Sequence, residues 1–292
     1  MICGDDLVRV LVTGARGQLG ADVLKELSSR DIEHKGVDLE DFDIADKQAT
    51  FDSLKKYHPD TVIHCAAYTA VDKAEDEPEL CCKVNVVGTE NLAQACRDAN
   101  AEMIYISTDY VFSGDGNTPY ETDSPKGPRS VYGKSKLAGE DAVLRHLERY
   151  YIVRISWVFG QQGNNFVKTM LNLSQTREEI NVVSDQIGSP TYTVDLAVLL
   201  CDMVLSKKHG IYHATNEGYC SWAEFAQEIM RQSGSHCRVN PISSAQYHTR
   251  AERPKNSRLS KRSLDEAMFR RLPEWKDALA KYLWDNSGHG FS

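Results

Sequence analysis

Residues 8–20 read VRVLVTGARGQLG and are followed by ADVLKEL at residues 21–27. VRVLVT is apolar and β-branched, as in a buried strand, whereas ADVLKEL consists of good helix formers. The glycines Gly14, Gly17 and Gly20 lie between them, spaced G-x-x-G-x-x-G. A strand, a glycine turn and a helix direct backbone N–H groups and a helix N-terminus at one point, where a pyrophosphate can bind. We therefore expect this loop to hold a dinucleotide.

The residues around this loop leave the type of dinucleotide open. A second strand, around residues 34–37, ends at Asp38, at about the distance from the glycines where an acid binds the adenosine ribose hydroxyls. Asp38 therefore favours NAD. Arg16, within the loop, favours NADP because a guanidinium can pair with a 2′-phosphate. Use of both cofactors remains an alternative.

Strand and helix patterns alternate from residue 8 to residue 106, which predicts an α/β fold with a doubly wound parallel sheet. Ligands of such sheets bind at the carboxyl ends of the strands. The strand 61–65 ends in small residues that allow a cofactor to approach the backbone. Residues 42–44 are expected to pass beside the adenine. Asn85, on the helix predicted for 79–99, either fastens neighbouring backbone behind the site or is solvated.

The alternation ends near residue 158, and this change predicts two domains. Residues 1–158 are expected to form a dinucleotide-binding Rossmann domain. Residues 159–292 are expected to form mainly a smaller α/β domain that binds the substrate. A helix at about 192–205 is predicted to return to the first domain.

A tyrosine and a lysine follow the strand that ends at Thr108. The chain reads IYISTDYVFSG at residues 104–114 and SVYGKSKLAGE at residues 130–140. Tyr132 and Lys136 then lie on one face of a helix, because residues i and i+4 are neighbours. We expect the Lys136 ammonium to lower the pKa of the Tyr132 phenol toward the range of a general acid. Alone, the Tyr-x-x-x-Lys pattern also fits an ordinary surface pair.

The composition excludes several classes of protein. The chain has 292 residues, of which 41% are hydrophobic and 26% charged, as in globular proteins. A net charge of -8 disfavours nonspecific nucleic-acid binding. No apolar run approaches the ~20 residues of a membrane span. The eight cysteines lack the spacing of zinc ligands, so we predict no metal site of this kind and a cytoplasmic protein without structural disulfides.

Several motifs occur in a characteristic order: TGARGQLG, Asp38, CAAYTAVDKAE, YISTDYVF, SWVFG, GNNFVKTM and DQIGSPT. In this order the chain resembles the extended short-chain dehydrogenase/reductases, and more narrowly the dTDP-4-dehydrorhamnose reductase family, from about Val8 to Trp284. The resemblance implies NAD(P)H-dependent reduction of dTDP-6-deoxy-L-lyxo-4-hexulose to dTDP-L-rhamnose. This is the last step of dTDP-L-rhamnose synthesis, which serves cell-surface polysaccharides.

The resemblance also implies roles for individual residues. Tyr132 is the expected proton donor, Lys136 tunes it and binds the nicotinamide ribose, and Thr108 is the catalytic hydroxyl. Besides Tyr132 and Lys136, the implied cofactor-binding residues are Gly14, Arg16, Gly17, Gln18, Leu19, Gly20, Asp38, Asp43, Ile44, Ala66, Ala67 and Tyr68. The implied substrate-binding residues are Thr108, Asp109, Trp157, Asn165, Gln186, Pro190 and Arg253, with Pro254 in the same segment.

One departure separates this chain from relatives that dehydrate sugars. Those relatives carry an Asp-Glu pair after this threonine, whereas here Asp109 is followed by Tyr110, so reduction is the expected reaction. One alternative is a non-catalytic regulatory subunit that binds a dinucleotide. Another is a reductase or epimerase of a different nucleotide sugar. The resemblance favours NADPH, and it leaves open the use of NADH, a homodimer and a Mg²⁺ ion.

Overall fold

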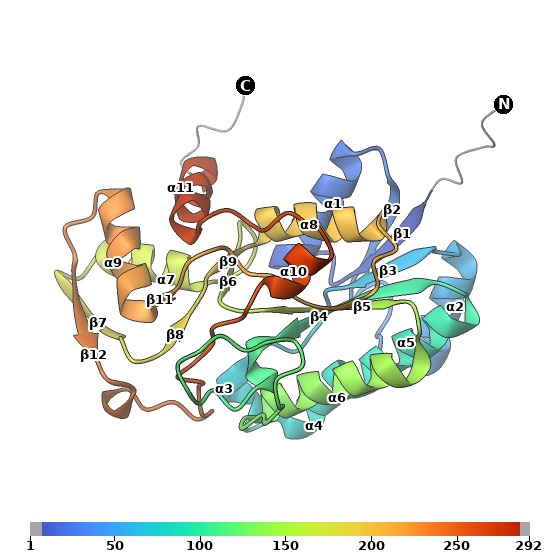
Figure 1. The fold of residues 1–292 in the computed structure, drawn as a ribbon, viewed down its shortest axis with the longest axis horizontal. Helices are drawn as coiled ribbons and strands as arrows, with labels where there is room; N and C mark the ends of the chain where they lie inside the picture. The colour runs from blue at the N-terminus through green and yellow to red at the C-terminus, as the bar shows by residue number, and fades with distance from the viewer. Residues whose placement is uncertain (1–7, 287–292) are drawn as a thin grey trace.

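The centre of the computed structural model, which describes residues 8–286, is a parallel sheet (Figure 1). In the described part of the chain this sheet has six strands in the order β10-β5-β4-β3-β1-β2. Their bounds are β1 (Arg9–Thr13), β2 (Glu33–Val37), β3 (Thr61–His64), β4 (Glu102–Thr108), β5 (Tyr150–Ile155) and β10 (Gly210–His213). Every pairing within it is parallel, so the predicted doubly wound α/β fold is confirmed.

Both faces of the sheet are buried at the strands β1, β3, β4 and β5, which explains their largely apolar sequences. Successive side chains of a strand point to opposite faces, so Val10 and Val12 join one hydrophobic cluster and Leu11 joins another. All three are completely buried. The apolar run VRVLVT therefore contributes side chains to the hydrophobic clusters on both faces of the sheet.

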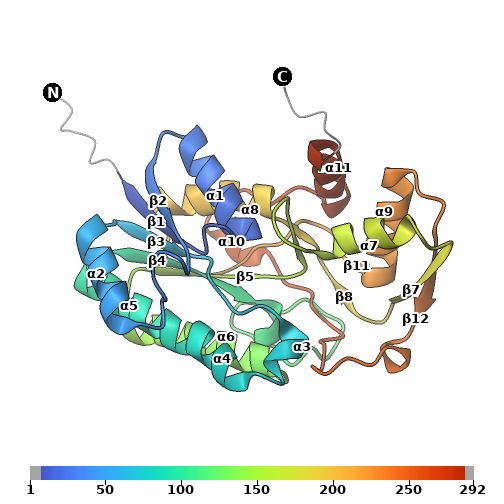
Figure 2. The same cartoon turned by 180° about the vertical axis from the view of Figure 1, so that it is seen from behind.

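Helices cover the two faces as separate layers (Figures 1 and 2). The first layer consists of α1 (Gln18–Ser29), α8 (Thr193–Val204) and α10 (Arg262–Glu266). The second consists of α2 (Lys47–Tyr57), α5 (Thr89–Asp98) and α6 (Val131–His146). The layer with α1 thus contains segments from both ends of the chain.

The register of the sheet brings the carboxyl ends of its strands together. Thr13, the last residue of β1, is level with Val37 of β2 and His64 of β3. On the other side, Thr108 of β4 is level with Ile155 of β5. The residues that follow these strands therefore share one edge of the sheet.

A second group of elements packs around its own hydrophobic cluster, which includes Phe159, Phe225 and Tyr282. Its longer elements are α7 (Phe166–Ser174), β7 (Glu179–Val183), α9 (Trp222–Ser233), β12 (Arg238–Ile242) and α11 (Trp275–Asn286). Two short strand pairs complete it, β6 (Val158–Phe159) with β9 (Thr191–Tyr192), and β8 (Ile187–Gly188) with β11 (Cys220–Ser221). This group lies beside the carboxyl edge of the sheet (Figure 1).

The short helices show where the sequence-based boundaries differ from the structure. The helix predicted for 79–99 is divided into α4 (Pro78–Cys82), the π-helix η1 (Lys83–Gly88) and α5. The remaining short helices are α3 (Val71–Ala74), η2 (Asp109–Val111) and η3 (Ser244–Gln246). A helix at about 192–205 is expected to return to the first domain. In the structure β10 also joins the sheet and α10 packs against it. The predicted domain bounds include residues 1–7 and 287–292, which lie outside the described residues.

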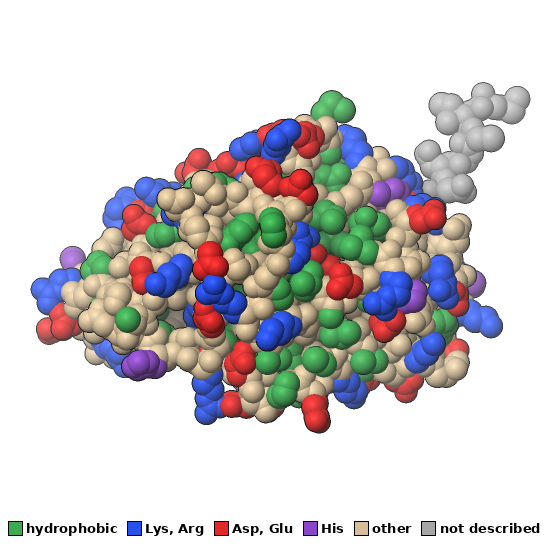
Figure 3. All heavy atoms as spheres, turned by 60° about the horizontal axis from the view of Figure 1, so that its bottom comes forward, with side chains coloured by type: hydrophobic (Ala, Val, Ile, Leu, Met, Phe, Trp, Pro, Cys, Tyr) green, Lys and Arg blue, Asp and Glu red, His purple; other side chains and the backbone are tan. Residues whose placement is uncertain are grey.

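The surface carries acidic, basic and apolar side chains together. On the face turned forward in Figure 3, acidic and basic groups are interspersed, with apolar side chains between them. Several large apolar residues are exposed, including Leu80 of α4 and Leu144 of α6. Among residues 8–286, no helix has the length and apolar character needed to cross a membrane.

A buried ion pair joins α6 to the sheet. Arg154 of β5 donates from Nε and Nη2 to the two Glu140 carboxylate oxygens, at 2.8 and 2.7 Å. Glu140 also accepts from the Ser107 hydroxyl on β4 at 2.6 Å. Arg154 further donates to the Thr122 carbonyl and lies 3.3 Å from His213 Nε2 on β10. Burial lowers the pKa of His213, so its neutral ring can accept this hydrogen bond.

We expect Glu140→Ala to lower the free energy of unfolding by roughly 3–5 kcal/mol, because it leaves the Arg154 guanidinium buried without its anion. Urea denaturation of the two proteins measures the difference. The control is Glu266→Ala, which breaks the exposed pair between Arg262 and Glu266. It should change stability little. Equal losses from the two variants would contradict this account of the buried pair.

Candidate active site

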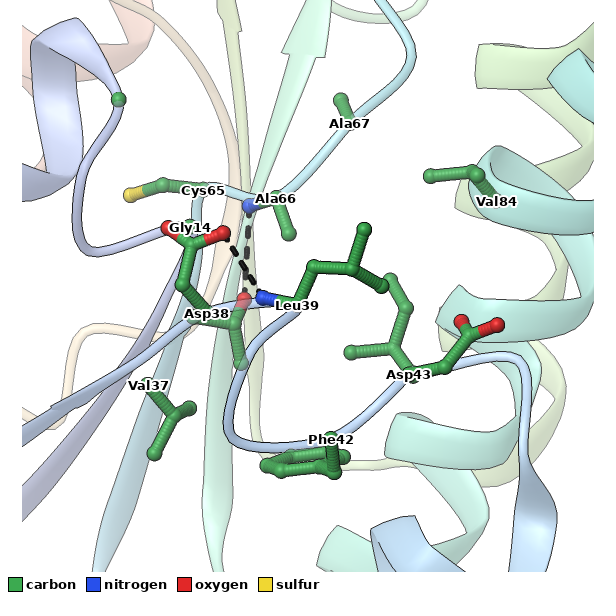
Figure 4. Close-up of a pocket in the computed structure, with 13 residues that line it drawn as sticks. Gly14, Val37, Asp38, Leu39, Phe42, Asp43, Cys65, Ala66, Ala67 and Val84 are labelled. Carbon is green, nitrogen blue, oxygen red and sulfur yellow. Dashed lines mark hydrogen bonds between the residues drawn. The ribbon is translucent and has the colours of Figure 1, made fainter.

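A cavity of about 300 Å³ opens at the carboxyl ends of β1, β2 and β3. In the sheet β1 lies between β2 and β3, so the chain passes from β1 to β2 on one side and then crosses to β3 on the other. The cavity lies at this switch point, the usual ligand position in such sheets. The predicted cofactor residues that line it are Gly14, Gly17, Asp38, Asp43, Ile44, Ala66 and Ala67. Figure 4 shows Asp38 beside Gly14, with Phe42 on one wall and Ala66, Ala67 and Val84 on another.

The glycine loop leaves the start of α1 available to an anion. Gly17 is the N-cap residue of α1 and has no side chain to bind the first helical N–H groups. Gly14 has φ +67°, and a Cβ there would lie 2.6 Å from the Ala66 backbone nitrogen. The turn thus packs directly against the strand end of β3. These residues fit a dinucleotide with its pyrophosphate at the helix N-terminus.

Asp38 and Arg16, which favour different cofactors, both have partners within the protein in this structure. The Asp38 carboxylate accepts from the backbone nitrogens of Arg16 and Leu39, both at 2.9 Å. The Arg16 guanidinium forms an ion pair with Glu40, and both side chains are mostly exposed. Asp38 is therefore held at the cavity wall, whereas Arg16 sits among acidic neighbours.

Asn85 fastens the loop after β3 to α6. Its side chain accepts from the Tyr68 nitrogen at 2.8 Å and donates to the Tyr68 carbonyl at 3.0 Å. It also donates to the Ser135 hydroxyl at 2.9 Å, and Ser135 is the neighbour of Lys136. Of the two interpretations of Asn85, the structure supports the fastening role. Asn85 lies in the π-helix, a feature frequent at functional sites.

The structure brings Thr108 and Tyr132 together at the end of β4. Ser130 caps α6 by accepting from the Gly133 nitrogen, and the helix begins at Val131. Tyr132 thereby lies in the first turn, and the nearby Thr108 hydroxyl acts to lower the pKa of its phenol. The ring of Tyr110 packs edge-on against Tyr132, with centroids 5.5 Å apart.

The expected effect of Lys136 on Tyr132 is wrong for the protein without ligands. Burial raises the pKa of the Tyr132 phenol rather than lowering it, although the Thr108 hydroxyl opposes this. Burial also lowers the pKa of Lys136 to about 7, and its Nζ lies over the Tyr105 ring, 4.1 Å from the centroid. Helical spacing places both groups on one face, but desolvation disfavours both charged forms. The resting tyrosine is therefore a neutral phenol that can donate a proton.

Some of the predicted substrate residues lie around this phenol. Arg253 donates to Asp72 at 2.6 Å and interacts with the Tyr110 phenol, while its buried Nε has no hydrogen-bond partner. Asp109 follows Thr108 directly and is buried. Pro254 packs against Gly114, where a Cβ would meet its Cα at 2.5 Å.

Trp157, shortly after the end of β5, has a strained backbone conformation. Its φ of +50° is rare for a residue of this size. Its ring stacks on Trp222 with centroids 3.7 Å apart and packs against Gly188, where a Cβ would lie 2.9 Å from the indole. A fixed aromatic face next to the strand ends is consistent with the role implied for Trp157.

Other predicted residues lie outside this group. Asn165 caps α7 and donates to Gln18 of the glycine loop at 3.0 Å, so it joins the second group of elements to the cofactor loop. Gln186 and Pro190 are buried in the loop between β7 and β9. The cavity itself does not include the predicted cofactor residues Arg16, Gln18, Leu19, Gly20, Tyr68, Tyr132 and Lys136.

Sequence reasoning missed five residues that line the cavity: Thr13, Val37, Leu39, Cys65 and Val84. The first four each adjoin a predicted residue at a strand end. These four residues could have been found from the sequence by including the immediate neighbours of each predicted residue. Val84 carries no such signal, because its apolar side chain fits the core pattern of a helix.

Together, the parallel sheet, the cavity at its switch point and the glycine turn define a dinucleotide-binding α/β protein of the extended short-chain dehydrogenase/reductase type. The chain belongs to the family described as RmlD substrate binding domain, whose model matches residues 8–287. This confirms the resemblance stated from the sequence motifs.

Individual relatives are similar over nearly their whole length. The spore coat polysaccharide biosynthesis protein SpsK of Bacillus subtilis (strain 168) is 41% identical over 281 residues, covering 96% of this chain and 99% of SpsK. A dTDP-4-dehydrorhamnose reductase structure from Clostridium acetobutylicum is 42% identical with a TM-score of 0.93, covering 94% and 98% of the two chains. The Bacillus anthracis dTDP-4-dehydrorhamnose reductase in complex with NADP is 40% identical with a TM-score of 0.93, covering 96% and 99%.

The resemblance leaves open whether a Mg²⁺ ion binds. Among residues 8–286, no group of three or more His, Cys, Asp or Glu side chains is arranged to hold an ion. We therefore assign no chemical role to Mg²⁺.

We expect Gly14→Ala to destabilise the protein and to weaken dinucleotide binding, because the added Cβ meets backbone atoms of the β3 loop. The matched control is Gly116→Ala. Gly116 has φ +80° but nothing within 4 Å of an added Cβ, so it isolates the cost of the left-handed backbone, about 1–2 kcal/mol. Thermal unfolding and NADPH titration measure both effects. A Gly14→Ala variant as stable as Gly116→Ala would contradict the close packing.

Proposed function

We propose that this chain reduces the 4-keto group of dTDP-6-deoxy-L-lyxo-4-hexulose, with NADPH as the hydride donor, to give dTDP-L-rhamnose. The observation that carries the proposal is the buried, neutral Tyr132 phenol in the first turn of α6, near the Thr108 hydroxyl at the carboxyl edge of the sheet. Relatives about 40% identical over nearly the whole chain are named dTDP-4-dehydrorhamnose reductase. When bound, the reduced nicotinamide supplies the hydride for C4 of the sugar.

In this proposal side chains of the protein donate the proton and orient the substrate. Tyr132 gives its proton to the sugar oxygen at C4, and the Thr108 hydroxyl holds that oxygen in place. Donors already in position stabilise the developing alkoxide without reorganisation. Lys136 binds the nicotinamide ribose. A cofactor or substrate anion close to its amine raises the pKa of Lys136 above its value without ligands, so the ammonium then stabilises the transient phenolate.

We assign the sugar nucleotide to the group of residues around Tyr132. The unpartnered Nε of Arg253 is a buried donor that suits a diphosphate oxygen, because guanidinium groups bind such anions through several N–H groups. Asp109 and Trp157 are proposed to contact the deoxysugar. Asn165, Gln186 and Pro190 remain predicted members of the same site. A homodimer and a cytoplasmic location also remain predictions.

Tyr132→Phe tests the proton donor. We expect a loss of about 10²–10⁴-fold in turnover of the keto-sugar nucleotide, because phenylalanine has no proton to give. NADPH affinity should change little. Tyr150→Phe, at the start of β5, is the control and should keep the wild-type rate. If the wild-type protein consumes no NADPH with this substrate, the result would instead favour a non-catalytic regulatory subunit that binds a dinucleotide. If NAD stays tightly bound through purification, the result would favour an epimerase.

Glu40→Gln tests the choice between NADPH and NADH. Removing this carboxylate frees the Arg16 guanidinium for a 2′-phosphate, so the ratio of kcat/KM for NADPH over NADH should rise roughly two- to fivefold, as for an exposed charge pair. The control is Glu33→Gln, which breaks the similar pair between Glu33 and Arg9 at the other end of β2. Steady-state kinetics with both cofactors measure this ratio. An unchanged ratio would show that Glu40 does not influence the preference between NADPH and NADH.

A further inference from the structure

We propose that Trp222 is a positioning residue of the substrate site, which holds the Trp157 indole in the orientation that contacts the deoxysugar. The inference rests on the proposed reductase function and on the sugar contact proposed there for Trp157. Trp222 is the first residue of α9, in the second group of elements. It acts on the sugar through Trp157 rather than by a contact of its own.

The Trp157 indole needs a support because its backbone does not favour the conformation observed. The φ of Trp157 is +50°, in the left-handed region that is costly for a side chain of this size. A residue persists in such a conformation only where the surrounding structure determines it, and such residues cluster at ligand sites. The local sequence alone therefore does not fix the direction of the indole, and its packing partners must do so.

Trp222 lies flat against the Trp157 ring. The two ring centroids are 3.7 Å apart, and the ring planes are 14° from parallel. This stacking covers one face of the Trp157 indole, so the proposed sugar contact uses the rest of the ring. Both tryptophans are partly buried and pack against the cluster that includes Phe159. A flat neighbour fixes the tilt of the indole as well as its position, which an aliphatic neighbour does not.

A single strand pair brings the supports of Trp157 together. The strands β8 and β11 are antiparallel, with Gly188 of β8 opposite Cys220 of β11. Gly188 makes room for the indole, because a Cβ there would lie 2.9 Å from the Trp157 ring. Ser221, the last residue of β11, begins α9 with a capping box, and the next residue is Trp222. The same two strands therefore admit one indole and start the helix that carries the other.

Phe166 extends this stack toward the cofactor loop. Its ring packs against Trp222 with centroids 4.6 Å apart and the planes inclined by 52°. Phe166 is the first residue of α7, and the N-cap residue Asn165 donates to Gln18 of the glycine loop at 3.0 Å. Trp222 is thus the middle member of an aromatic row that begins beside the glycine loop and ends at Trp157. Its replacement separates Trp157 from this anchor.

Trp222→Leu tests the stacking, because leucine keeps an apolar side chain but has no flat ring. We expect the KM for the keto-sugar nucleotide to rise roughly two- to tenfold, as for the loss of one aromatic pair. The kcat and the KM for NADPH should stay within about twofold of the wild type, because the variant removes only a binding interaction. Inhibition by dTDP, which lacks the sugar, should be unchanged. Trp222→Phe keeps a flat ring and should restore most of the substrate affinity.

The control is Trp275→Leu, which removes an indole from the same hydrophobic cluster. Trp275 packs edge-on against Phe225, with centroids 5.6 Å apart. This variant should lower the temperature of thermal unfolding but keep the wild-type KM for the keto-sugar nucleotide. An equal rise of this KM in Trp222→Leu and Trp275→Leu would indicate a general loosening of the second group of elements and would overturn the positioning role.

Circular dichroism detects the stack without cofactor or substrate. Two stacked indoles couple excitonically, so the wild type and Trp275→Leu should show a couplet that Trp222→Leu and Trp222→Phe lack. A wild-type spectrum without the couplet would overturn the proposal while the reductase function stands. So would a wild-type KM in Trp222→Leu, a raised KM that Trp222→Phe does not restore, or an equal weakening of inhibition by dTDP. If the wild-type protein oxidises no NADPH with this substrate, the reductase function fails, and the role of Trp222 fails with it even where the couplet is present.

Discussion

The pair between Glu140 and Arg154 is the constraint on which the site depends. It joins α6 to β5, and Ser107 extends the same contact to β4. Glu140 lies one helical turn beyond Lys136, and Ser107 directly precedes Thr108. The anchor therefore fixes the helix that carries the phenol against the strand that carries the hydroxyl. A charged pair in a dry interior favours one arrangement strongly, because any other leaves a charge without its partner.

Burial rather than charge sets the resting state of the site. The sequence places an amine near a phenol, and a purely coulombic argument predicts a more acidic phenol. The fold instead surrounds both groups with protein, so burial raises the pKa of the Tyr132 phenol and lowers the pKa of the Lys136 amine. The Tyr132 phenol therefore keeps its proton in this structure. Desolvation depends on packing from distant parts of the chain, which local spacing does not report.

What the sequence predicted follows from local rules. The glycine turn, the alternation of strand and helix, and the placement of Tyr132 and Lys136 on one helix depend on residues close in the chain, and the structure has them as expected. The π-helix at 83–88, the place of β10 on the sheet and Val84 in the cavity depend on tertiary packing. The roles assigned to individual site residues came from resemblance, and they stay predictions until they are measured.

The place of β10 affects how the chain can fold during synthesis. This strand comes from residues 210–213, yet it completes the sheet beside β5. A growing chain that ends before it exposes the open backbone edge of β5 and lacks the His213 contact of Arg154. Unpaired strand edges promote aggregation. A nascent chain that ends before residue 210 therefore has an incomplete sheet, and the sheet closes only when this later segment is made.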